Sequence, residues 1–109
     1  MPLPRNLEVL AREGDLVLGR AGRVSWAEPD PRVQSVSIYD ETTCRVLAYA
    51  NRVRKTRRSQ WPDWDVGLTD GLRGPLAEVR NRVAVCFELI AGAAERIELS
   101  DSLVAKTED

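Results

Sequence analysis

The sequence predicts a small α+β domain, with an antiparallel sheet or barrel in its first half and one packed helix in its second half. The chain has 109 residues, the size of a single domain. Apolar and polar residues alternate around glycine-bearing turns over residues 6–58, whereas residues 74–99 carry apolar residues at spacings of three and four. We therefore expect one domain, in which a tryptophan-containing loop at 59–73 joins the two halves and a charged tail at 100–109 follows.

Glycine-bearing turns divide the beginning of the chain. Gly14-Asp15 is typical of a turn, and the apolar run Leu16–Leu18 follows it. Residues 19–22 hold two more glycines, and Val24–Trp26 then alternates again, which predicts a hairpin. The preceding segment, Asn6–Arg12, fits either a first strand or a short helix.

A second hairpin is predicted after the loop that Pro29 and Pro31 impose. Val33–Tyr39 is rich in β-branched and aromatic residues and has the period-two alternation of a half-exposed strand. The polar run Asp40–Thr43 predicts a turn, and Cys44–Tyr49 returns as the antiparallel partner. The adjacent acids of this run, Asp40 and Glu41, are therefore expected to serve the turn and not acid–base chemistry.

This half of the chain resembles a known group of small barrels. Gly14-Asp15-Leu16-Val17, followed by Gly22-Arg23-Val24, is similar to the opening of SH3-like barrels of the KOW and Tudor type. Those barrels begin with a Gly-Asp-aliphatic strand and re-enter with Gly-Arg-Val. The resemblance covers residues 14–55. It implies a small antiparallel SH3-like sheet or barrel, and it implies binding to nucleic acid or peptide.

A helix is predicted after Gly74-Pro75, because proline is favoured at the first helical position. Glu78 would lie in the first turn, where the helix dipole favours an acid, and Gly92 predicts the end of the helix. Apolar residues at helical spacing form one stripe: Leu76, Val79, Val83, Cys86 and Ile90.

The second half of this helix leaves alternatives open. Val83–Ala91 is apolar nearly all round, so a second copy of the protein would cover the side that the sheet does not. Alternatively, Val83–Phe87 is a strand, since β-branched and aromatic residues favour sheets. Arg96–Leu99 also alternates and fits a last strand.

Basic charge is concentrated in one segment. The whole chain has 16 basic and 17 acidic residues, yet five cations lie within seven positions: Arg52, Arg54, Lys55, Arg57 and Arg58. Such a cluster suits the phosphates of nucleic acid or an acidic protein surface. The alternative is a solvated segment that keeps the end of an edge strand from pairing.

Two tryptophans follow the basic segment. Trp61 and Trp64 lie in a proline-bearing loop, where side chains are usually polar. Beside a basic run, an indole can stack on a base. The alternative is that both indoles cap the core, which is also the expectation for Trp26 in the first hairpin.

The sequence contains few of the residues that catalytic and metal sites usually need. The chain has no histidine, which removes the commonest general base and metal ligand, so we expect no enzyme and no cofactor. The acids Asp63, Asp65 and Asp70 do not have the spacing of a calcium loop and suit turns. Cys44 and Cys86 lie in apolar runs and are expected to be buried free thiols.

These observations predict a small binding module located in the cytoplasm, because no signal peptide or membrane span is evident. The favoured hypothesis is nucleic-acid binding through the basic segment with Trp61 and Trp64. The alternative is a structural or regulatory subunit that binds a protein partner and forms a homodimer through Val85, Phe87 and Leu89.

Overall fold

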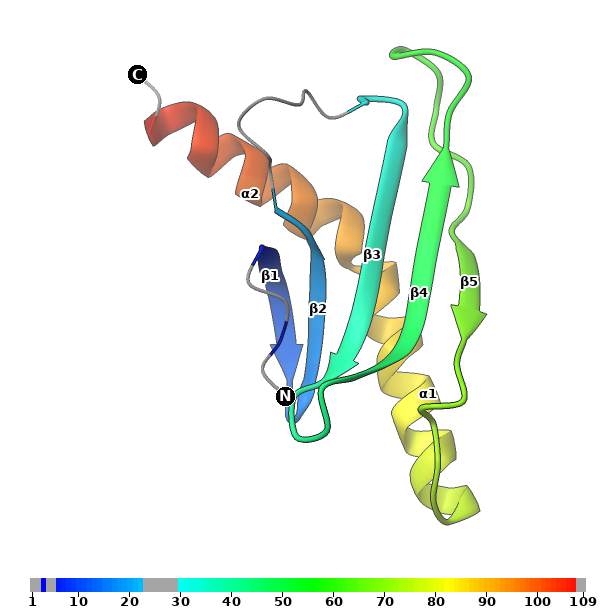
Figure 1. Cartoon of the computed structure of the whole chain (residues 1–109). Coiled ribbons are helices and arrows are strands. Elements are labelled where there is room, and N and C mark those ends of the chain that lie inside the picture. Colours follow the sequence, from blue (N-terminus) through cyan, green and yellow to red (C-terminus); the bar gives the residue numbers. More distant parts are fainter. Residues whose placement is uncertain (1–2, 4–5, 23–29, 108–109) are drawn as a thin grey trace.

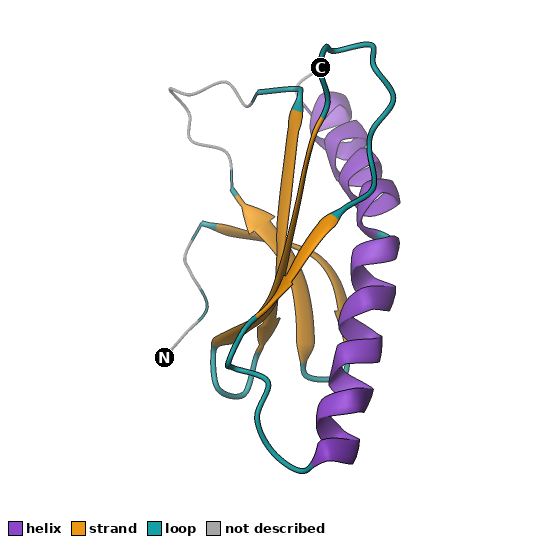
Figure 2. Cartoon of the chain, turned by 90° about the vertical axis from the view of Figure 1, so that its right-hand side faces the viewer, coloured by secondary structure: helices purple, strands orange, loops and turns teal. Residues whose placement is uncertain are grey.

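Five antiparallel strands form one sheet, and two helices cover one of its faces (Figures 1 and 2). The computed structural model describes Leu3, residues 6–22 and residues 30–107. The strands lie in the sheet in chain order, each antiparallel to the next: β1 (Leu7–Glu13), β2 (Leu16–Ala21), β3 (Val33–Asp40), β4 (Arg45–Val53) and β5 (Asp65–Leu68). The helices are α1 (Leu76–Ala91) and α2 (Ala93–Thr107).

The predicted α+β class is confirmed, but the sheet does not close into the expected SH3-like barrel. Within the described residues, β1 pairs only with β2 and β5 pairs only with β4, so both are open edges. The two helices bury the apolar face of the sheet in place of barrel closure. Two helices are present where one was expected, because Arg96–Leu99 lies within α2 and the tail stays helical to Thr107.

Several strand predictions are confirmed. The hairpin of Val33–Tyr39 and Cys44–Tyr49 corresponds to β3 and β4, which pair along most of their length. The ambiguous segment Asn6–Arg12 is strand β1. The second strand of the first predicted hairpin, Val24–Trp26, lies outside the described residues. In the tryptophan-containing loop, the short strand β5 was missed.

The two cysteines differ in their surroundings. Cys86 is completely buried, as expected, and burial raises the pKa of its thiol. The prediction for Cys44 was wrong, because this residue is half-buried and lies in the β3–β4 turn, just before β4 begins. Its backbone has a positive φ of 58°, which suits a turn and not a strand. Neither cysteine forms a disulfide in the described structure.

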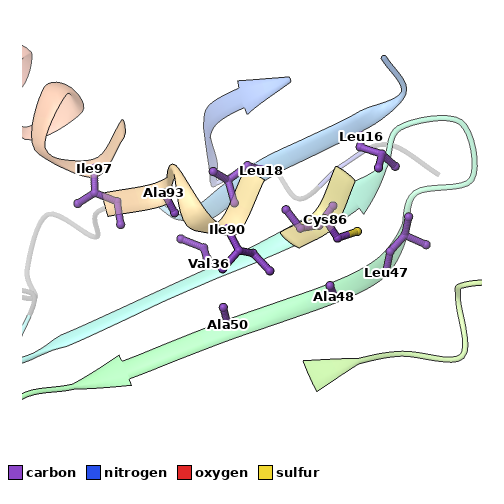
Figure 3. Packing of buried hydrophobic residues seen from close by; sticks show 11 residues of the cluster. Leu16, Leu18, Val36, Leu47, Ala48, Ala50, Cys86, Ile90, Ala93 and Ile97 are labelled. Carbon is purple, nitrogen blue, oxygen red and sulfur yellow. The ribbon is translucent and has the colours of Figure 1, made fainter. Parts of the chain in front are cut away.

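The core lies between the sheet and the helices (Figure 3). Because side chains alternate along a strand, every second residue of β2 and β3 points to the helices, and β4 does the same except at a register shift, where Leu47 joins the core beside Ala48. The strands contribute Leu16, Leu18, Val36, Ile38, Leu47, Ala48 and Ala50, and the helices contribute Cys86, Ile90, Ala93 and Ile97. The helix interpretation of Val83–Ala91 is thereby confirmed over the strand alternative.

α1 and α2 are two parts of one bent helical rod. Gly92 between them keeps right-handed helical angles. Its N–H donates to Glu88 O at 3.2 Å, and the N–H of Arg96 donates to Gly92 O at 3.3 Å, which continues the helical hydrogen-bond pattern. No helix in the described part of the chain is both long and apolar enough to cross a membrane.

Candidate nucleic-acid interface

The basic segment spans the end of β4 and the loop after it. Arg52 and Val53 belong to β4, and residues 54–64 form the connection to β5, here called the cationic loop. It extends beyond the ends of β4 and β5 (Figure 1). The loop contains four cationic side chains and one carboxylate, Asp63. The structure divides its predicted site residues into two groups.

The first group is an interleaved stack of arginines and tryptophans. The guanidinium carbon of Arg52 lies 4.7 Å from the ring centre of Trp61 and 4.4 Å from that of Trp64. The Arg54 guanidinium lies 4.3 Å from the Trp61 ring. Cations at these distances are attracted to the electron-rich ring faces. Both indoles are therefore partnered within the chain.

Hydrogen bonds hold the same two arginines. Arg52 donates to the Gln34 side chain of β3 at 2.7 Å, and Arg54 donates through two nitrogens to Pro31 O at 3.2 and 2.9 Å. Burial lowers the pKa of Arg52, and the nearby charge of Arg54 acts in the same direction. Arg52, Arg54, Trp61 and Trp64 thus anchor the base of the cationic loop to the sheet.

The tip of the loop is a tight turn. The Ser59 N–H donates to Thr56 O at 3.3 Å, which closes a β-turn with Arg57 and Arg58 at its two central positions. The Thr56 hydroxyl accepts from the N–H groups of Arg58 and Ser59, and it lies 2.8 Å from the Ser59 hydroxyl. Side-chain bonds of this kind stabilise turns, so the two arginines sit at a fixed apex.

The second group consists of cations without a side-chain partner. Lys55, Arg57 and Arg58 are exposed, and their side chains form no ion pair or hydrogen bond with another described residue. Arg57 lies close enough to Asp30 to affect its pKa, but the ion pair of Asp30 is with Arg32 at 3.0 Å. That pair, followed by the weaker charge of Arg57, lowers the pKa of Asp30. Three cations therefore remain available at the tip.

The predicted self-association residues are also divided. Val85 and Leu89 are partly buried and pack against the core, whereas Phe87 on the outer side of α1 is 48% exposed. The acids Asp63, Asp65 and Asp70 do not come together. Asp65 is in β5, Asp70 pairs with Arg73 at 3.6 Å, and no described group of three acids or cysteines is placed to hold a metal ion.

Sequence reasoning found the cations and indoles but missed the residues that hold them. Gln34 and Pro31 lie far away in the sequence and gave no local indication. The closing pair Thr56 and Ser59 was detectable, because hydroxyl residues three apart around two arginines are typical of a turn. Comparison with protein-family models, curated proteins and solved structures found no match to the chain.

Proposed function

We propose that this protein is a binding module without catalytic activity, and that its cationic loop grips nucleic acid. The observation that carries the proposal is the turn of residues 56–59, which presents Arg57 and Arg58 beside Lys55, and no carboxylate among the described residues is paired with any of the three. Phosphates bind where cations are clustered, and they release condensed counterions on binding.

The stack at the base of the loop supports this function indirectly. Trp61 and Trp64 are held by Arg52 and Arg54, so stacking on bases is not assigned to these indoles. Their role in the proposal is positioning, because a loop fixed before binding loses less conformational entropy when it meets its ligand. The contact itself is assigned to Lys55, Arg57 and Arg58.

Anisotropy of a labelled oligonucleotide at low salt tests the proposal. The variant Arg57→Glu/Arg58→Glu should weaken binding by about tenfold or more and flatten its salt dependence. The matched control is Arg80→Glu/Arg96→Glu, which changes the net charge equally at exposed helix positions. The proposal fails if the wild-type protein binds no oligonucleotide, or if the two double variants weaken binding equally.

Self-association remains a second candidate because of one observation on the helices. Phe87, Leu99 and Leu103 are 48%, 55% and 57% exposed. A second copy of the chain covering Phe87 would form the homodimer expected from the sequence. Light scattering at high protein concentration tests this candidate, with Phe87→Glu compared with Ala84→Glu on the same exposed side of α1. A wild-type mass equal to one chain excludes it.

A further inference from the structure

The face of the sheet opposite the helices, here called the open face, has an unusual composition. Its members follow from alternation and register, because their neighbours along each strand point into the core. On the first four strands they include Leu7, Val9, Val17, Gly19, Ala21, Val33, Ser35, Ser37, Tyr39, Tyr49, Asn51 and Val53. The register also places Arg12 on this face, opposite Val17, and Arg12 pairs with Glu41 at 2.6 Å; the other members are uncharged. Exposed tyrosine with serine and asparagine is the composition of antibody paratopes, in which tyrosine supplies contact area and the small polar residues supply hydrogen bonds.

The two faces differ in how their polar groups are used. On the helix side, several charged and amide side chains form bonds within the fold. Arg20 pairs with Glu8 at 2.8 Å and Asp101 at 2.6 Å, and Asp40 pairs with Arg82 at 2.7 Å. On the open face, five polar side chains form no side-chain hydrogen bond with another described residue: Ser35, Ser37, Tyr39, Tyr49 and Asn51. Ser35, Tyr49 and Asn51 are exposed, and Ser37 and Tyr39 are half-buried.

A shallow groove runs along β2 on this face. Its lining comes from residues 6–7, from Gly19–Ala21 of β2 and from Ser35–Ser37 and Tyr39 of β3. The Leu7 side chain lies over Gly19, where a Cβ would be 2.7 Å from it, and both Val17 and Gly19 are buried, so the accessible part of this face is on β3 and β4. An extended ligand lying along β3 would therefore meet a row of hydroxyl groups.

Tyrosine rings lie next to the groove. Tyr49 of β4 is 45% exposed, and its ring covers Gly67 of β5, the residue with which it is paired. On β3, Ser37 pairs with Tyr49, and Tyr39 follows two residues after Ser37. Both rings are therefore on neighbouring strands of the same face. Stacking of a base on an exposed aromatic ring contributes about 1–3 kcal/mol.

Charge indicates which ligand fits. The cationic loop begins directly after Val53, and Val53 pairs with Val33 at the end of the open face. The carboxylate that alternation places on this side is Asp65 of the edge strand β5, opposite Asn51. A neutral face with hydroxyls and aromatic rings suits bases, and the cations at its end suit the phosphates that connect them.

We propose that the open face binds single-stranded nucleic acid. In this complex, unpaired bases lie against Tyr49, Tyr39 and the β3 hydroxyls, and the phosphate backbone continues to Lys55, Arg57 and Arg58. This inference rests on the proposed function of the cationic loop and names its substrate class. A duplex, whose bases are stacked inside, presents only its phosphates to the loop.

Charge placed on the open face gives the sharpest test. Ser35 is exposed at the middle of the open face, and Ala84 is exposed on the far side of α1. With a labelled oligothymidylate, Ser35→Glu should weaken binding by about tenfold and Ser35→Arg should strengthen it. Ala84→Glu and Ala84→Arg, which carry the same charges on the helix layer, should leave binding within about twofold of wild type.

Stacking is tested at Tyr49. Tyr49→Leu should weaken binding of the single strand by roughly 5- to 150-fold, the equivalent of one stacked base, whereas Tyr49→Phe should retain it. Because Tyr49 also covers Gly67, thermal unfolding of each variant is measured in parallel. The exposed Ser35 variants keep the test valid if Tyr49→Leu fails to fold.

The outcomes separate this inference from the proposed function. Stronger binding of the single strand than of the duplex, together with the Ser35 response, supports both. Two results would show that the open face is not the site while the proposed function stands. In the first, the loop variant abolishes binding but the Ser35 and Ala84 variants behave alike. In the second, the loop variant abolishes binding but duplex and single strand bind equally. If the wild-type protein binds neither probe, the proposed function itself is overturned.

Discussion

Arg82 of α1 donates a hydrogen bond to Asp40 at the end of β3, with 2.7 Å between the guanidinium nitrogen and the carboxylate oxygen. Asp40 has a side chain only 6% exposed and also accepts the N–H of Thr42 at 2.9 Å. The pair joins the helix layer to the β3–β4 turn. A second ion pair, between Arg20 and Asp101, joins α2 to β2.

Removal of Arg82 should destabilise the protein. Arg82→Met leaves the Asp40 carboxylate buried without its cation, and we expect the free energy of unfolding to fall by about 1–3 kcal/mol. Arg80→Met is the matched control, because Arg80 is exposed on the same helix, and its effect should stay within about 0.5 kcal/mol. Urea unfolding measures both, and equal effects would show that the ion pair contributes no net stability.

The same carboxylate predicts a pH dependence. Burial alone would raise the pKa of Asp40, but the hydrogen bonds from Arg82 and from the Thr42 backbone outweigh it, so the pKa is lower than usual. A carboxyl with a lower pKa in the folded state stabilises the fold above its unfolded pKa of about 4, and this contribution disappears as the pH falls through the folded pKa. The stability difference between wild type and Asp40→Asn should therefore be largest near neutral pH and shrink in acid. A difference that stays constant in acid would contradict this assignment.

The arginine–tryptophan stack should hold the cationic loop in place. Arg52→Met keeps the apolar stem but removes the cation between Trp61 and Trp64, and should cost about 1–2 kcal/mol of unfolding free energy. Arg58→Met at the exposed tip should cost less than about 0.5 kcal/mol. Limited trypsin digestion is the second measurement. Cleavage in the loop should accelerate in Arg52→Met, and an unchanged rate would mean that the stack does not order the loop.

Two glycine substitutions should have opposite signs. A Cβ at Gly67 would fall within the ring of Tyr49, so Gly67→Ala should destabilise the sheet by about 1–3 kcal/mol. At Gly92 the nearest atoms to an added Cβ are Glu88 O at 3.8 Å and Leu89 O at 3.9 Å, and the backbone is already helical. Gly92→Ala should therefore stabilise the protein by about 0.5–1 kcal/mol. Thermal unfolding distinguishes the two, and a shift of the same sign in both would refute this account.

Local patterns predicted the elements that are formed by local forces. The hairpin of β3 and β4 and the amphipathic helix α1 were both evident, because alternation and helical spacing record which side chains are buried. Strand β5 was missed, since its four residues include Gly67 and are ordered by pairing with β4. The barrel was an incorrect expectation, because strand patterns are the same in a closed and an open sheet. What decides between them is the partner of the edge strands, which is not a local property.

The sequence predicted which residues form the candidate site, but it did not predict which of them are held by the fold and which are exposed. The cluster at Arg52–Arg58 was evident from charge alone. That Arg52 and Arg54 are held internally, while Lys55, Arg57 and Arg58 remain available, depends on Gln34 and Pro31 from distant strands. The open face was not predicted either, because membership of one face depends on register across four strands.

The order of the core residues along the chain bears on how the protein folds during synthesis. The strands come first, and the residues that cover their apolar face, from Cys86 to Ile97, come last. At about 5–20 residues per second, a ribosome needs roughly 1–6 seconds to proceed from Leu68 to Ile97. Throughout that interval Leu18, Val36 and Ile38 lack their cover, so the sheet can acquire its buried core only after the last part of the chain has been made.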